Sequence, residues 1–126
     1  MTTPEVEIEC ISAITLFTRD MARAVHFYRA LGLTLLYGDE KAPFCSFKAG
    51  SGYINLASGQ PPERLWGRAI LYVSDVDAMY QRALVAGFSP EMPPADAAWG
   101  ERYFHLRDPD GNELSFARPL SPTRTA

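Results

Sequence analysis

Residues 13–33 read AITLFTRDMARAVHFYRALGL, and residues 68–88 repeat their pattern without a gap as RAILYVSDVDAMYQRALVAGF. The identities are few, but Asp20 meets Asp75 and apolar residues keep their places along the alignment. An internal repeat is a signal at the level of the fold. The sequence therefore predicts two copies of one structural unit.

Each copy predicts a strand followed by a helix. Residues 11–18 and 68–73 are rich in β-branched and aromatic side chains, which favour strands. A carboxylate that can cap a helix follows each strand, apolar residues recur at helical spacing, and a glycine suited to a left-handed cap ends the run. The expected caps are Asp20 and Gly32 in the first copy, and Asp75 and Gly87 in the second.

Short strand-like runs follow each helix, so each copy is predicted to be a βαβββ module. They are residues 34–37, 44–48 and 53–57 in the first copy, and 103–107 and 113–118 in the second, with a loop or irregular edge over 89–101. A module of about 50 residues is small for a core of its own, so the two should pack together. We expect a single α+β domain over residues 1–126. Its parts are a module at about 8–58, a linker at 59–67, a module at about 68–119 and a tail at 120–126.

Composition excludes several classes of protein. The chain has 126 residues, with 47% hydrophobic and 21% charged, which is typical of a globular domain. The net charge of −3 disfavours nucleic-acid binding and is compatible with a neutral or cationic small ligand. The start MTTPEVEIEC lacks the features of a signal peptide, and no apolar run has transmembrane length. Cys10 and Cys45 are expected to be buried free thiols, so we expect a cytoplasmic protein with no membrane partner.

The charged stretch RYFHLRDPDGNELSFARP, residues 102–119, first suggests a metal or acid–base site. Its centre fits a hairpin turn better. Pro109 presets φ, Asp108 can accept hydrogen bonds from backbone N–H groups, and Gly111 can take a positive φ. A calcium loop of the EF-hand type would need a longer run of ligands that ends in glutamate.

Together these segments resemble the vicinal oxygen chelate superfamily, which includes glyoxalases, dioxygenases and bleomycin-resistance proteins. The resemblance covers about residues 8–119 and is strongest in TRDMARAVHFYRALGL and WGERYFHLRDPDGNELSFARP. It implies paired βαβββ modules around a cleft, commonly in a homodimer. It also implies one divalent metal, held by His, Gln or Glu on the first and last strands of each module.

The resemblance places those four ligand positions on residues with weak or no metal affinity. Ala13 has no donor atom, and Arg68 is a permanent cation that repels a metal. Asn55 and Ser115 are neutral oxygen donors, and Ser115 stands where metal-binding members have glutamate. We therefore expect no metal cofactor in this protein.

Several polar residues near these positions have more than one interpretation. Glu113 shares a strand face with Ser115, so it is either a ligand-binding carboxylate, a partner of Arg68 or a solvated side chain at the strand start. Arg68 either marks an anionic ligand group or extends into solvent. His105 is expected to have a packing or hydrogen-bonding role, with acid–base catalysis as the alternative. His26 is expected on the surface.

Aromatic side chains complete the predicted cleft, which would suit a planar or hydrophobic compound. The candidate ligand-binding residues are Thr15, Phe17, Asn55, Arg68, Tyr72, Trp99, Tyr103, His105, Glu113 and Ser115. The resemblance and the missing metal ligands favour a metal-free protein that binds or sequesters a small molecule such as an antibiotic or metabolite, as a homodimer. The alternatives are a lyase, isomerase or dioxygenase, metal-free or with unusual ligands, and an interaction module with a vestigial cleft.

Overall fold

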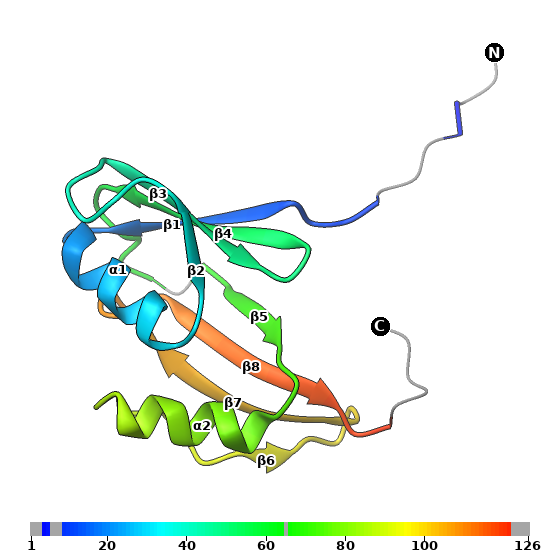
Figure 1. Cartoon of the computed structure of the whole chain (residues 1–126). Coiled ribbons are helices and arrows are strands. Elements are labelled where there is room, and N and C mark those ends of the chain that lie inside the picture. Colours follow the sequence, from blue (N-terminus) through cyan, green and yellow to red (C-terminus); the bar gives the residue numbers. More distant parts are fainter. Residues whose placement is uncertain (1–3, 6–8, 65, 122–126) are drawn as a thin grey trace.

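A computed structural model describes residues 4–5, 9–64 and 66–121, and it contains the two predicted modules (Figure 1). The first module consists of β1 (Ala13–Thr18), α1 (Met21–Ala30), β2 (Thr34–Tyr37), β3 (Phe44–Ala49) and β4 (Gly52–Ser58). The second consists of β5 (Arg68–Tyr72), α2 (Val76–Val85), β6 (Ala95–Asp96), β7 (Glu101–Arg107) and β8 (Glu113–Pro119). The predicted α+β fold with tandem βαβββ units is confirmed.

Each module forms a four-stranded mixed sheet. The strand orders are β1-β4-β3-β2 in the N-terminal sheet and β5-β8-β7-β6 in the C-terminal sheet. The first strand of each module pairs in parallel with its last strand, and the other neighbours are antiparallel. The equivalent strands of the two sheets therefore occupy equivalent places.

The helix ends are capped as the sequence predicts. The side chain of Asp20 accepts a hydrogen bond from the backbone N–H of Arg23, and that of Asp75 accepts one from Ala78. Just after the helices, Gly32 and Gly87 have φ values of 100° and 88°. These local signals set the length of both ten-residue helices.

One face of each sheet packs beneath its helix and the opposite face, here called the open face, is turned away. On β1 the buried Leu16 alternates with Phe17, which is 43% exposed, and on β5 the buried Ala69 alternates with Ile70. The core lies on the helix side, where Tyr28 and Phe104 are fully buried. The predicted division of each first strand into a helix face and an open face is confirmed.

The modules are joined through α1. Phe27 packs on Phe88 with ring centroids 4.6 Å apart, and Arg82 Nε donates a hydrogen bond to the carbonyl of Ala30. Tyr28 donates its hydroxyl hydrogen bond to Asp108 in the second module. Helix α1 thus contacts both halves of the chain.

Three details differ from the sequence-based expectation. Strand β1 begins at Ala13, because Ile11 is 76% exposed and lies outside the packed part. Cys45 is buried as expected, but the prediction for Cys10 is wrong: its thiol is exposed in the segment before β1. The irregular edge at 89–101 contains a two-residue strand, β6.

The predicted tail at 120–126 lies mostly outside the described residues. None of the described helices is long and apolar enough to cross a membrane.

Candidate functional site

The structure divides the candidate residues between the two open faces. Seven candidates lie together on the C-terminal sheet or its edge: Arg68, Tyr72, Trp99, Tyr103, His105, Glu113 and Ser115. Three lie on the N-terminal sheet: Thr15, Phe17 and Asn55. The C-terminal set contains all of the candidates with a charged or imidazole side chain and most of the aromatic ones.

Arg68 and Glu113 form an ion pair at the start of this face. They are register partners across the parallel strands β5 and β8, and Arg68 Nη2 lies 3.1 Å from Glu113 Oε2. The side chain of Glu113 is 4% exposed, and that of Arg68 is 41% exposed. Of the alternatives for Glu113, pairing with Arg68 is confirmed and a solvated carboxylate is wrong. Strand β8 is central, so its neighbours cover this side chain.

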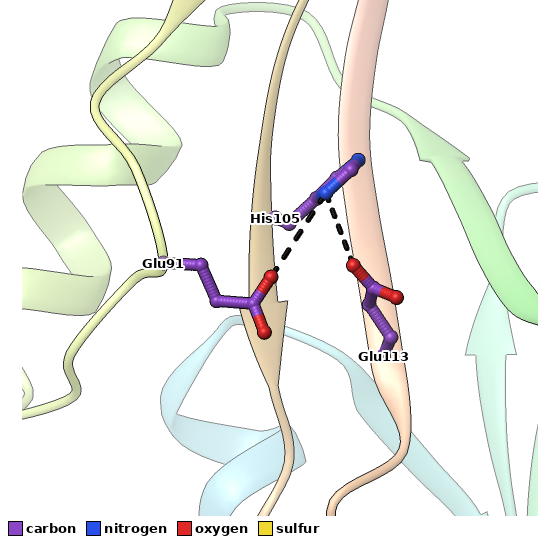
Figure 2. A group of neighbouring side chains, drawn as sticks. All are labelled: Glu91, His105 and Glu113. Carbon is purple, nitrogen blue, oxygen red and sulfur yellow. Dashed lines mark ion pairs between the residues drawn. The ribbon is translucent and has the colours of Figure 1, made fainter. Parts of the chain in front are cut away.

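His105 lies on the other side of the same carboxylate (Figure 2). Its Nδ1 atom is 3.0 Å from Glu113 Oε1 and 4.0 Å from Glu91 Oε2. Arg107 in turn contacts Glu91, with 2.5 Å between Nε and Oε1. The loop before β6 thus brings Glu91, which no sequence pattern selects, beside His105 and Arg107 of β7.

The group Glu91, His105 and Glu113 has metal-like spacing but an unsuitable charge environment. Its potential ligand atoms all lie within 4.8 Å of one another. However, Arg68 and Arg107 already contribute one positive charge beside each carboxylate. A divalent ion would add two positive charges next to two guanidinium groups, which opposes binding. This group therefore does not suit a metal.

The four positions at which the resemblance implies metal ligands do not suit one either. Ala13 offers no donor, and the guanidinium of Arg68 is committed to Glu113. The side-chain amide of Asn55 donates a hydrogen bond to Thr15 Oγ1 at 3.2 Å. Ser115 is buried and pairs in register with His105 on β7. A set of one cation, one amide and one hydroxyl lacks the anionic or imidazole donors that divalent metals prefer.

A row of rings continues from His105 toward the edge of the sheet. Tyr103 lies 5.1 Å from the ring of His105 and 5.3 Å from that of Trp99. Trp99 and Tyr72 are 59% and 50% exposed, so both present ring surface to solvent. Between them, Glu101 accepts hydrogen bonds from the indole N–H of Trp99 and the hydroxyl of Tyr72.

Glu101 is a site residue that sequence reasoning missed. Its strand, β7, alternates so that Glu101, Tyr103 and His105 share one face. That alternation was a usable signal once Tyr103 and His105 were candidates. The hydrogen bonds to residues 72 and 99 could not be foreseen, because they depend on how β5 and the loop before β7 meet.

The predicted hairpin turn at residues 108–112 is confirmed, and its polar side chains Asp108, Asp110 and Asn112 are buried. Asp108 accepts hydrogen bonds from the backbone N–H groups of Asp110 and Asn112, and Gly111 has a φ of 87°. Burial raises the pKa of Asp108, and its hydrogen bonds act in the opposite direction. Asn112 also donates to the carbonyl of Phe17, so the turn is structural and ties β8 to β1.

A separate cavity of about 280 Å³ lies on the N-terminal side and is partly lined by candidates. Thr15 and Phe17 form one wall, and Trp66 of the linker contributes another. Trp66 therefore lies beside two of the candidate residues. His26 is exposed on α1, as expected.

Comparisons with known proteins agree with this architecture. The chain matches the Glyoxalase/Bleomycin resistance protein/Dioxygenase superfamily over residues 11–116. An uncharacterised Mycobacterium bovis protein, Mb0911c, is 33% identical over 95 residues; the match covers 73% of this chain and only 56% of that protein. A bleomycin-binding protein complexed with bleomycin has a TM-score of 0.72 at 22% identity, with 88% of this chain and 98% of that chain covered. Lactoylglutathione lyase from Agrobacterium tumefaciens has a TM-score of 0.72 at 22% identity, covering 87% and 93%.

Proposed function

The chain belongs to the glyoxalase, bleomycin resistance protein and dioxygenase superfamily, and from that premise we propose that it is a metal-free small-molecule-binding protein. Its ligand is a hydrophobic or aromatic compound, such as an antibiotic or metabolite, which it binds or sequesters. Sequestration requires affinity alone, so no catalytic group has to be present.

One observation carries this proposal: a charge pair stands where the superfamily is expected to hold its metal. Arg68 occupies a first-strand ligand position, and its charge is balanced by the buried Glu113 at 3.1 Å. A guanidinium is always protonated and cannot become a metal ligand. The other expected positions offer only Ala13, Asn55 and Ser115. A protein with this donor set has to recognise its ligand through side chains.

The open faces support an aromatic or apolar ligand. On β5, Ile70 is 59% exposed and Tyr72 is 50% exposed, and Trp99 extends the same surface. Exposed apolar surface of this kind commonly marks a binding site.

We also propose that the protein is a homodimer in which a second copy covers part of these faces. Light scattering on the eluted protein tests this, and a monomer at micromolar concentration would overturn it.

The test combines metal analysis with a ligand screen. Protein purified without metal-affinity resin should contain far less than one divalent ion per chain by mass spectrometry of the elements. A panel of aromatic antibiotics and metabolites, including bleomycin, should contain compounds that raise the melting temperature, because a ligand specific for the folded state stabilises it. Stoichiometric metal lost in a His105→Ala, Glu113→Gln or Glu91→Gln variant would overturn the metal-free state. A panel without any stabilising compound would count against ligand binding.

A second candidate function is metal-free catalysis as a lyase or isomerase. It is favoured by His105 Nδ1, which lies 3.0 Å from the buried carboxylate of Glu113. A histidine beside a carboxylate can transfer protons, and the cation of Arg68 could stabilise developing negative charge. Turnover of lactoylglutathione in the presence of a chelator, abolished by His105→Ala and by Arg68→Ala, would support this function. Turnover unaffected by both substitutions would exclude it.

A further inference from the structure

Two adjoining cavities lie where the linker between the modules passes the end of β1 and the turn at residues 108–112. The first has a volume of about 280 Å³ and is partly lined by Phe17. The second has a volume of about 240 Å³ and extends from the linker to the turn. Both are lined by Pro62, Trp66 and Asn112, so one ligand can occupy the two together.

The first cavity offers aromatic surface on a well-fixed backbone. Phe17 is 43% exposed and Trp66 is 53% exposed. The linker is tied to the end of β1 at Gly59, whose N–H donates a hydrogen bond of 3.0 Å to the carbonyl of Thr18. On the other side, the side chain of Asn112 donates to the carbonyl of Phe17. Two rings held in this way favour the planar apolar part of a ligand.

The second cavity is lined by three arginines: Arg19, Arg64 and Arg107. Arg107 uses Nε for Glu91 and Nη1 for the carbonyl of Gly111, so its Nη2 atom has no partner among the described residues. Arg64 is exposed and forms no ion pair within the described part of the chain. Guanidinium N–H groups are therefore available to an acceptor, and their planar geometry suits a carboxylate.

Positive charge exceeds negative charge around this second cavity. Its lining contains two carboxylates, Glu63 and Asp110, against the three arginines. Ion-pair partners add one charge of each sign, since Asp110 also contacts Arg23 and Arg107 contacts Glu91. One positive charge is thus in excess here, although the whole chain has a net charge of −3. This local excess favours an anionic ligand group.

We infer that the two cavities form a binding site for an aromatic carboxylate, with its ring against Phe17 and Trp66 and its carboxylate beside Arg64 and Arg107. The inference rests on the proposed function, because it specifies the chemical class of the small molecule. It also assigns that molecule to the junction of the linker, β1 and the turn at residues 108–112.

Three probes of similar shape test the inference: 2-naphthoate, 2-naphthylmethanol and 2-naphthylmethylammonium. The readout is the indole Nε1–H signal of Trp66 in nitrogen–proton correlation spectra during titration with each probe. The chain has two tryptophans, so a Trp99→Phe variant assigns the two signals. The carboxylate should shift the Trp66 signal and bind about tenfold more tightly than the alcohol, because it accepts charge-assisted hydrogen bonds from arginine.

Two charge-neutralising variants locate the effect. Arg64→Gln should reduce the affinity for 2-naphthoate about fivefold and leave that for the alcohol unchanged. Arg118→Gln is the matched control, because Arg118 is exposed near the end of β8 that lies opposite the turn. It removes the same charge from the chain and should leave both affinities unchanged.

Each outcome has a defined consequence. Equal affinities for the carboxylate and the alcohol would overturn the inference and leave aromatic binding intact. Tighter binding of the ammonium probe would also overturn it and assign recognition to the carboxylates of the lining. A carboxylate that shifts only the Trp99 signal would overturn the location. If no probe binds, aromatic binding itself is contradicted. Should Arg64→Gln not fold, the three probes on the natural sequence still decide the question.

Discussion

The hydroxyl group of Tyr28 connects α1 to the turn at residues 108–112, and the Tyr28→Phe substitution tests how much this connection stabilises the fold. Tyr28 is fully buried, and its hydroxyl donates a hydrogen bond of 2.9 Å to Asp108 Oδ2. The substitution removes one oxygen and keeps the ring, whose centroid is 5.7 Å from that of Phe47. The packing of α1 should therefore be unchanged.

The expected loss follows from the hydrogen bonds that remain at Asp108. Its carboxylate accepts from the backbone N–H groups of Asp110 and Asn112, from the Asn112 side chain and from Tyr28. The variant keeps three of these four bonds, and Oδ2 keeps one partner. A hydrogen bond to a charged group contributes about 1.5–3 kcal/mol. We expect the free energy of unfolding to fall by about 2 kcal/mol.

Urea denaturation followed by circular dichroism measures this change. The midpoint should fall while the slope stays constant, because the surface exposed on unfolding is unchanged. Tyr80→Phe is the control: its ring packs on Phe104, and its hydroxyl makes no hydrogen bond within the described part of the chain. That variant should change stability by less than about 0.5 kcal/mol. Equal effects of the two substitutions, or no effect of Tyr28→Phe, would refute the argument.

Three further predictions follow from the same structure. Burial and the neighbouring Asp108 raise the pKa of Tyr28. The phenol of Tyr28 therefore ionises in the unfolded chain above about pH 10, before it does so in the folded protein, and the free energy of unfolding should fall as the pH rises from there. Urea midpoints compared between pH 9 and 11 should fall less steeply in Tyr28→Phe. Asp75→Ala removes the N-cap of α2 and should cost about 1 kcal/mol in the same assay, whereas Asp75→Asn should retain most of the stability. Arg68→Met leaves the buried Glu113 without its guanidinium partner and should cost about 3 kcal/mol, most of it recovered in the double variant with Glu113→Gln. A double variant no more stable than Arg68→Met would show that the two side chains are not coupled.

The fold could be predicted from sequence because its determinants are local and occur twice. Asp20 and Asp75 cap helices through side chains that reach only three residues ahead. Gly32 and Gly87 end them by conformation alone. Such signals are independent of tertiary contacts, so they can be recognised in the sequence before the packing of the chain is known. The burial of Cys10 was mispredicted because composition alone cannot show where the packed part of the chain begins.

The candidate site was predicted less completely, because it depends on contacts between distant segments. Glu91 reaches His105 from a loop without regular structure, and Glu101 is held by Tyr72 on β5 and by Trp99 in the loop before β7. Spacing along one strand cannot reveal either contact. Tyr103 and His105 are candidates by residue type, and the alternation of β7 places both on the same face.

The pairing register explains why Arg68 and Glu113 have to be considered together at the expected metal position. Counting from the turn selects Ser115, but the parallel ladder places Glu113 beside Arg68 and Ser115 beside Ile70. Glu113 without Arg68 would be a buried carboxylate with only His105 beside it, at 3.0 Å. The guanidinium of Arg68 therefore stabilises a carboxylate at position 113. Replacing Arg68 by histidine would remove the guanidinium charge that stabilises Glu113, while Ala13 and Ser115 would still offer no strong ligand.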